Sequence, residues 1–228
     1  MPGGASPGLP AGRLGMDFDL SRKDIDVEAG AKRALKDEPF LSGLLANLKT
    51  KRETVRFNSF KILSEICRTN PETLYPRWDV FVDQLLGDNT YWKLAAIPLI
   101  AGLTRVDREN KFEKIFGLYY GLLEDRSFIP GVYLAKSSAE IVAAKPHLET
   151  RIVDALLRID ATPHHPERRD LVKASIIEFF SDIMGKTVHR EKIVPFVQKQ
   201  LHSSSPKTRK AAATFLEKWD PRSGEKKG

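Results

Sequence analysis

A short pattern of apolar and basic residues recurs along this chain at nearly regular intervals. Its second position, basic in most copies, falls at residues 56, 93, 132, 173 and 209, which gives steps of 37, 39, 41 and 36 residues. In each copy, core positions follow the first residue after four, eight and eleven residues. On a helix that turns about 100° per residue, these positions lie within about 80° of one another and form one apolar face. A single helix cannot bury such a face by itself, so neighbouring copies must cover it.

Four of the five copies keep the pattern in full. Their core positions are Val55, Ser59, Leu63 and Ile66; Trp92, Ala96, Ile100 and Leu103; Val172, Ile176, Phe180 and Ile183; and Thr208, Ala212, Leu216 and Trp219. The remaining copy has Gly131, Ala135, Ala139 and Val142, with Val132 in place of the basic residue. We therefore expect one packing unit to be repeated five times.

The chain carries helix signals throughout and lacks the alternating pattern and Asn-Gly turns of strands. Thr50 with Glu53 predicts a capping box, and Asp88 or Asn89 a cap of the next copy. Asn70-Pro71 and Ser205-Pro206 place a cap residue before a first-turn proline. A second set of helices precedes the copies, and each member ends at a leucine: Leu48, Leu86, Leu123, Leu157 and Leu201. About ten helices in pairs are expected, and the fold class is all-α.

The pairs divide the chain into a repeat domain with two flanking tails. The repeats span about 39–70, 71–109, 110–145, 146–186 and 187–220. Residues 16–38 are expected to cap the stack with one helix at 21–37, which Ser21 and Asp24 begin. Residues 1–15 hold three Pro and five Gly, and we expect a disordered tail there. Residues 221–228 read as a polar tail.

The spacing Val-Arg-x-x-Ala-x-x-x-Leu-x-x-Ile, with an aspartate upstream, resembles a HEAT repeat, and the likeness covers roughly residues 39–219. This resemblance to HEAT/armadillo-type proteins implies a right-handed α-α superhelix, a solenoid of about five helix pairs. A four-helix bundle does not need ten short helices, and a globin-like fold shows no period. Proteins of this type commonly act as scaffolds.

Composition narrows the function classes. The chain has 228 residues, a single cysteine (Cys67) and no apolar run of about 18 residues. A disulfide framework, a Cys-based zinc site and a membrane-spanning helix are therefore not expected. Cys67 and the tryptophans Trp78, Trp92 and Trp219 read as core residues. The absence of a signal segment favours a cytoplasmic protein, or a nuclear one in a eukaryote.

No chemistry-bearing constellation stands out. The histidines are scattered, and carboxylates such as Asp79, Asp83 and Asp107 form no acid/base pair. We expect neither an enzyme nor a protein with a bound metal or cofactor. The paired histidines His164 and His165 lie in a proline-rich loop without further ligands nearby in the sequence.

The net charge is +7 and the isoelectric point about 9.4. The excess lies in the first and last repeats, at +4 each, with −2, +1 and −1 between them. Nucleic-acid binding is permitted by this balance, but a DNA-tracking groove favours a continuous basic stripe.

The basic residues of the copies form a ladder: Arg56, Lys93, Lys173 and Arg209. Two interpretations are open. The ladder contacts phosphates or an acidic peptide, or it pairs with loop carboxylates of its own or a neighbouring repeat. Its place beside the core edge favours the second.

The position after each ladder residue points away from the core, about 200° around the helix from the first core position. It holds Phe57, Leu94 and Tyr133, followed by Ala174 and Lys210. We call Phe57, Leu94 and Tyr133 the apolar row. Aligned on a concave face with Lys61, Lys136 and Lys210 nearby, the row predicts binding of a protein segment with acidic flanks. The alternative is that the N-terminal helix or a neighbouring layer covers it.

The stretch DNTYWKLAAI (88–97) is similar to a segment of the AlkD-type DNA glycosylases, which are built from HEAT-like helix pairs. This resemblance implies a nucleic-acid-binding relative as the alternative function. The family's Trp-Trp-x-x-x-Asp element is missing, because the helix KFEKIFGLYYGLLED has Phe116, Tyr119 and Tyr120 but no Asp after a Trp. The likeness is to the scaffold and not to the active site.

Overall fold

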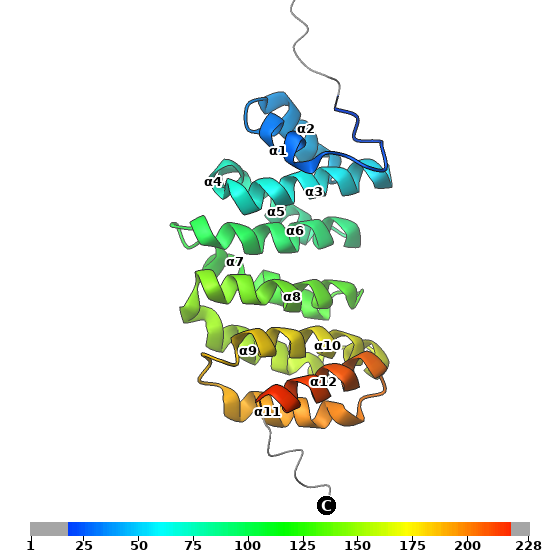
Figure 1. The fold of residues 1–228 in the computed structure, drawn as a ribbon, viewed down its shortest axis with the longest axis vertical. Coiled ribbons are helices and arrows are strands. Elements are labelled where there is room, and N and C mark those ends of the chain that lie inside the picture. Colours follow the sequence, from blue (N-terminus) through cyan, green and yellow to red (C-terminus); the bar gives the residue numbers. More distant parts are fainter. Residues whose placement is uncertain (1–17, 220–228) are drawn as a thin grey trace, which may run out of the picture.

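The computed structural model describes residues 18–219, which form α-helices and short 3-10 turns, with no strand in that range (Figure 1). The expected tails at 1–15 and 221–228 lie outside these residues. The first helices of the pairs are α2 (Glu38–Asn47), α5 (Trp78–Leu86), α7 (Lys111–Gly121), α9 (Glu149–Leu157) and α11 (Arg190–Lys199). The second helices are α3 (Glu53–Thr69), α6 (Thr90–Leu103), α8 (Ile129–Ala144), α10 (Pro166–Ile183) and α12 (Pro206–Trp219). Two further helices are α1 (Val27–Ala34) and the short α4 (Pro71–Leu74).

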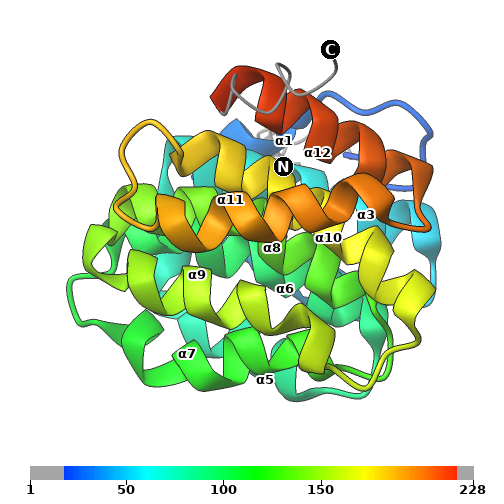
Figure 2. The same cartoon turned by 90° about the horizontal axis from the view of Figure 1, so that it is seen from below.

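The helices pack in sequence order. Figure 1 shows α3, α6, α8 and α10 stacked one below the other, and Figure 2, along the stack, places α5 and α7 at one edge and α12 at the opposite edge. Helix α8 packs on α6 and α10, and α10 also packs on α12. Contacts run mainly between elements close in the chain, so the described residues form an all-α array built by sequential packing.

Hydrogen bonds between residues 38 positions apart tie neighbouring pairs together. The Lys145 ammonium donates to the Asp107 carbonyl at 3.4 Å, and the Trp219 indole N–H donates to the Ser181 hydroxyl at 3.1 Å. Three more bonds of this spacing are Asn58 to the Leu20 carbonyl, Arg105 to the Cys67 carbonyl and Thr208 to the Asp170 carbonyl. The spacing of these contacts agrees with the sequence period.

Most of the predicted core positions are buried, and each copy contributes some of them. Ala96, Ile100, Val172 and Phe180 have no exposed surface, and Ser59 and Thr208 are also buried. Trp92, Ala139 and Trp219 are only half-buried, whereas Trp78 is buried as expected. Trp219 is half-buried because it ends the last described helix and no further repeat follows it within residues 18–219.

Cys67 lies where α3 meets α6. Its thiol is 3.5 Å from the Leu99 carbonyl, and a Cβ at Gly102 would stand 2.6 Å from its Sγ. Burial raises the pKa of this thiol to about 12. Cys67 is thus an inert core residue, as predicted.

The helix start predicted at Thr50 is wrong. Thr50 does not cap α3, because Arg52 takes that position and the Thr50 hydroxyl accepts from the Arg52 N–H at 3.3 Å instead. The starts at Asn89 and Ser205 are confirmed. The Asn89 side chain accepts from the Tyr91 N–H at 2.9 Å, and the Ser205 hydroxyl accepts from the Thr208 N–H at 3.3 Å. Asn70 precedes the proline that begins α4, but its side chain makes no cap hydrogen bond.

The N-terminal helix is shorter than predicted. Helix α1 begins at Val27 with Asp26 as its cap, and Ser21 instead donates to the Asp19 carboxylate. The segment before α1 stays non-helical because the Asn58 amide donates to the carbonyls of Leu20 and Arg22, at 2.9 and 2.8 Å. Those bonds hold the segment across α3. A tertiary contact with α3, and not the local sequence, therefore keeps residues before Val27 out of the helix.

Candidate interaction surface

The apolar row lines one groove of about 230 Å³ on the exposed face of α3, α6 and α8. Phe57 is 55% exposed and Tyr133 36%, while Leu94 is half-buried. The three residues meet because the second helices stack in the same rotational phase, so equivalent positions align. The structure therefore brings together the three residues that the sequence singled out.

Phe60 and Tyr91 complete this groove, and neither was predicted. Tyr91 is 60% exposed, the largest fraction among the aromatic side chains of the groove. Each lies three residues from a row member on the same helix, and residues so spaced share a helix face. This three-residue spacing is the sequence feature from which Phe60 and Tyr91 could have been predicted. We call Phe57, Phe60, Tyr91, Leu94 and Tyr133 the aromatic groove.

Cations surround the aromatic groove. The Arg56 guanidinium lies 4.8 Å from the Tyr91 ring centre, and the Lys61 ammonium lies 4.5 Å from the Phe57 ring centre. Lys136, three residues after Tyr133, is exposed. Glu53 is the acidic residue among those that line it. The rim is therefore basic around an apolar floor.

The row does not extend into the fourth and fifth repeats. Ala174, the next equivalent position, is fully buried because α12 packs across α10. Lys210 lies beside Ile177 and Phe215 in a separate groove of about 430 Å³. Lys210 is thus not part of the aromatic groove.

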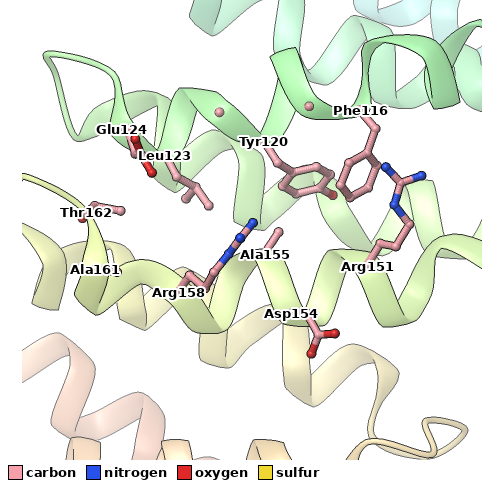
Figure 3. A pocket seen from close by; sticks show the side chains of 12 residues that line it. Phe116, Tyr120, Leu123, Glu124, Arg151, Asp154, Ala155, Arg158, Ala161 and Thr162 are labelled. Atoms are coloured by element: carbon pink, nitrogen blue, oxygen red, sulfur yellow. The ribbon is translucent and has the colours of Figure 1, made fainter.

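A larger groove of about 710 Å³ opens between α7 and α9 (Figure 3). Phe116, Tyr120 and Leu123 line one wall, and Arg151, Ala155 and Arg158 line the other. The Tyr120 hydroxyl pairs with the Ser138 hydroxyl at 2.9 Å, and the neighbouring Tyr119 donates to the Ile97 carbonyl at 3.0 Å. These aromatic residues are evident in the sequence, whereas the groove is not, because its walls come from two repeats.

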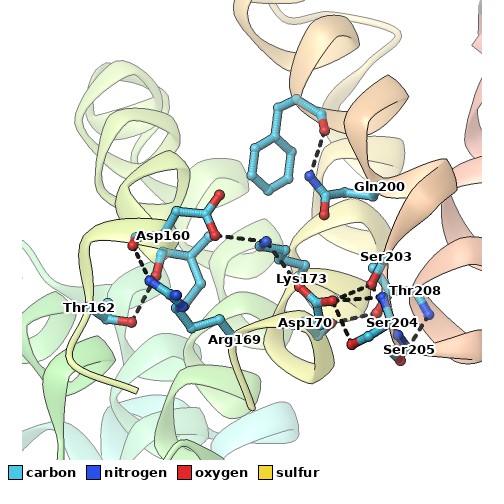
Figure 4. A network of polar contacts seen from close by, with 12 residues as sticks. Asp160, Thr162, Arg169, Asp170, Lys173, Gln200, Ser203, Ser204, Ser205 and Thr208 are labelled. Carbon is cyan, nitrogen blue, oxygen red and sulfur yellow. Dashed lines mark hydrogen bonds and ion pairs between the residues drawn. The ribbon is translucent and has the colours of Figure 1, made fainter. Parts of the chain in front are cut away.

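Loop groups engage every member of the basic ladder. Lys173 pairs with Asp160 at 2.7 Å and with Asp170 at 3.0 Å (Figure 4). Arg56 donates to the Thr50 carbonyl at 2.8 Å, and Arg209 donates to the Ser203 carbonyl at 2.7 Å. These three cations therefore bind the segment that precedes their own helix.

In the copy that lacks a basic residue, the preceding repeat supplies the cation for the loop carboxylate. Asp125 lies in the loop before α8, where Val132 supplies no cation. Lys93 of the preceding repeat pairs with Asp125 instead. Burial would raise the pKa of this carboxyl, but bonds from Lys93 and the Ser127 N–H outweigh that effect and lower it.

Asp170 joins the last two repeats (Figure 4). Its carboxylate accepts from the Ser203 hydroxyl at 2.7 Å and from the Ser204 N–H at 2.9 Å. Burial alone would raise the pKa of this carboxyl. The hydrogen bonds from Ser203, Lys173 and Ser204 outweigh burial and lower the pKa to about 2.

A buried ionic cluster joins the second and third repeats. Lys145 pairs with Asp107 at 3.1 Å and with Glu113 at 2.9 Å, and the Tyr75 hydroxyl donates to Asp107 at 2.7 Å. Asp107 also caps α7 by accepting from the N–H groups of Lys111 and Phe112, each at 2.9 Å. Both carboxylates accept hydrogen bonds from groups of the protein, so we assign the cluster to structure.

Residues 18–219 contain no group of three or more His, Cys, Asp and Glu side chains placed to hold a metal ion. Within the same range, no helix combines the length and apolar character that crossing a bilayer requires. Comparison with protein-family models, curated proteins and solved structures finds no match to this chain.

Proposed function

We propose that this chain is a HEAT-type scaffold that binds a protein segment in the aromatic groove. In this proposal the helix pairs form a right-handed α-α superhelix of about five repeats, with the second helices on its concave side. The hydrogen bonds between residues 38 apart support a repeating unit of HEAT length.

The aromatic groove carries the functional proposal. Phe57, Tyr91 and Tyr133 expose large side chains on three successive second helices, although an array of this size has ample core to bury aromatics. Exposed apolar surface rimmed by polar residues marks interaction sites, and aromatic residues dominate interface hot spots. The groove therefore suits a partner more than it suits the free protein.

The rim defines the partner's chemistry. Arg56 lines the apolar floor and Lys61 lies over the Phe57 ring, whereas Glu53 is the one acidic residue among those that line the groove. Lys136 is exposed three residues after Tyr133. A segment with an aromatic or aliphatic centre and acidic flanks matches this distribution. Opposite charges at a rim raise the association rate and select against basic partners.

This surface favours a protein segment over nucleic acid. The ladder cations are held by loop groups of the protein, and Glu178 and Asp182 interrupt the exposed face of α10. Nucleic-acid affinity depends on many cations that neutralise phosphates along a track. We likewise propose that the chain is not an enzyme, since its buried titratable groups serve as interrepeat clamps.

Selection of binding peptides tests this function. Random peptides displayed on phage are selected on the immobilised protein, and the chosen sequences are expected to carry apolar centres with acidic flanks. The affinity of a selected peptide is expected to fall by a factor of about 10 or more in the double variant Phe57→Ser, Tyr133→Ser, because two anchor side chains are lost. Isothermal titration calorimetry measures the affinity.

The matched control is Leu86→Ser with Val188→Ser, which removes two exposed apolar side chains from other parts of the surface. This variant should bind the peptide as the wild type does. Equal loss in both double variants contradicts the assignment to the aromatic groove. A salt titration with duplex DNA completes the test. A slope of more than about two in the logarithm of affinity against the logarithm of salt concentration would favour the nucleic-acid alternative.

A further inference from the structure

The floor of the groove between α7 and α9 is formed by small residues, and no side chain covers it. A Cβ added at Gly117 or at Gly121 would meet no atom within 4 Å, and the opposite helix presents Ala155. The rings of Phe116 and Tyr120 are buried and form an apolar wall beside this floor. At about 710 Å³ the groove has the size of a ligand site.

Two guanidinium groups enter this groove from the α9 side (Figure 3). The guanidinium carbon of Arg151 lies 4.0 Å from the centre of the Phe116 ring. The Arg158 side chain extends toward Tyr120 and Leu123. Among residues 18–219, neither has a hydrogen-bond or ion-pair partner. Asp154, on the same helix, also lines the groove, and its carboxylate pairs with Lys192 at 2.8 Å.

The unmatched charge distinguishes these arginines from the ladder. Lys93, Lys173 and Lys145 all meet carboxylates, and Arg56 and Arg209 donate to loop carbonyls. Arginine beside an aromatic ring keeps its in-plane N–H groups free to bind a carboxylate in bidentate fashion. Arg151 and Arg158 are therefore arranged to receive an anionic group from outside the protein.

We propose that the α7–α9 groove is a second binding site, which takes an acidic peptide segment. Arg151 and Arg158 are seven residues apart, about 10 Å along two helical turns. On an extended chain, side chains two residues apart share a face and lie about 7 Å apart, a separation that two flexible arginine side chains can meet. The two carboxylates of such a segment pair with the two arginines, and an apolar residue between them lies over Gly117 and Gly121.

The lining charges select a peptide over a nucleic acid. Glu124 and Asp154 stand at the groove beside the two arginines. The phosphates of a nucleic acid would lie along the whole groove and be repelled by both carboxylates. A peptide carries negative charge only at its acidic side chains, which can lie at the two arginines. Because this site lies on the first helices, it is independent of the aromatic groove on α3, α6 and α8.

Fluorescence anisotropy tests the site with a labelled peptide, Glu-Glu-Leu-Glu-Glu-Leu-Glu-Glu, at low ionic strength. The wild type is expected to bind it, and the glutamine version of the peptide is expected to bind at least about 10-fold more weakly. The double variant Arg151→Gln, Arg158→Gln should lose binding by a similar factor. A second variant, Gly117→Leu with Gly121→Leu, should also block the groove without lowering the melting temperature, because leucine has the higher helix propensity.

Lys186→Gln with Lys199→Gln is the matched control, since it removes two exposed positive charges that line neither the α7–α9 groove nor the aromatic groove. Unchanged binding by this control, with loss in both groove variants, supports the site. Equal loss in the control means general electrostatic attraction and overturns the proposal. Absence of wild-type binding, or competition by oligothymidine with the same dependence on Arg151 and Arg158, also overturns it. The Phe57→Ser, Tyr133→Ser variant should keep this binding, so failure here is distinguishable from failure of the aromatic groove.

Discussion

We expect Ala96→Asp to lower the free energy of unfolding by about 3 kcal/mol or more. Ala96 has no exposed surface and lies in the middle of α6, which packs on both α5 and α8. The new carboxyl would stand in the interior, and the nearest repeat cation, Lys93, already pairs with Asp125. The aspartate must be buried charged without a partner or become protonated, and both are costly. Urea denaturation followed by circular dichroism measures the change.

Ala213→Asp is the control for this prediction. Ala213 lies within α12 and is exposed, so the same change costs helix propensity without burying a charge. We expect a loss of less than about 1 kcal/mol there. Equal stability of the Ala96→Asp variant and the wild type would mean that the core is placed wrongly.

The location of the damage is also predictable. In an array where units contact mainly their neighbours, a broken interface loosens adjacent units before the whole array unfolds. Hydrogen exchange in the Ala96→Asp variant should therefore rise first in α5, α6 and α8 and less in α11 and α12. Uniform exchange along the chain would contradict this.

The second large effect is expected from Asp170→Asn. A pKa lowered from the ordinary 3.8 to about 2 corresponds to about 2 kcal/mol of stability at neutral pH. Asparagine keeps the shape but not the charge, so the bonds from Ser203, Ser204 and Lys173 weaken. Denaturation at pH 7 is expected to show a loss of about 2 kcal/mol.

The difference between the two proteins should depend on pH with a definite sign. The pKa of Asp170 is lowered in the folded state, so its contribution is complete above the unfolded value near 3.8 and is lost as the pH falls toward 2. The gap between wild type and Asp170→Asn should therefore close between about pH 5 and pH 2. Asp182→Asn, at an exposed position of α10, should show no such gap. A gap that stays constant with pH would mean that the Asp170 charge is not the cause.

The repeated core was predictable because burial follows from helical phase alone. Val172, Ile176 and Phe180 carry the same pattern as Val55, Ser59 and Leu63, and the structure buries all six. Helix starts were predictable where proline or asparagine acts locally, as at Asn89. The start near Ser21 was not, because a residue in α3, Asn58, decides the conformation there from 36–38 positions away.

The candidate surfaces also have features that the sequence predicts and features that it does not. The apolar row was predictable since Phe57, Leu94 and Tyr133 occupy one repeat position that points away from the core. The end of that row at Ala174 was not predictable, because its burial arises where α10 packs on α8 and α12. The α7–α9 groove depends on the gap between two helices, which is set by how their repeats pack.

The amino-acid sequence alone determined the helical class, the period and the buried face, because each depends on the order of residues within one helix and its copies. Only the tertiary structure decided which group each ladder cation contacts, where the aromatic groove ends and that Arg151 and Arg158 stay unpaired. Those features depend on the distance and angle between helices from different repeats. Such angles arise from side-chain packing across the whole stack, which no local pattern encodes.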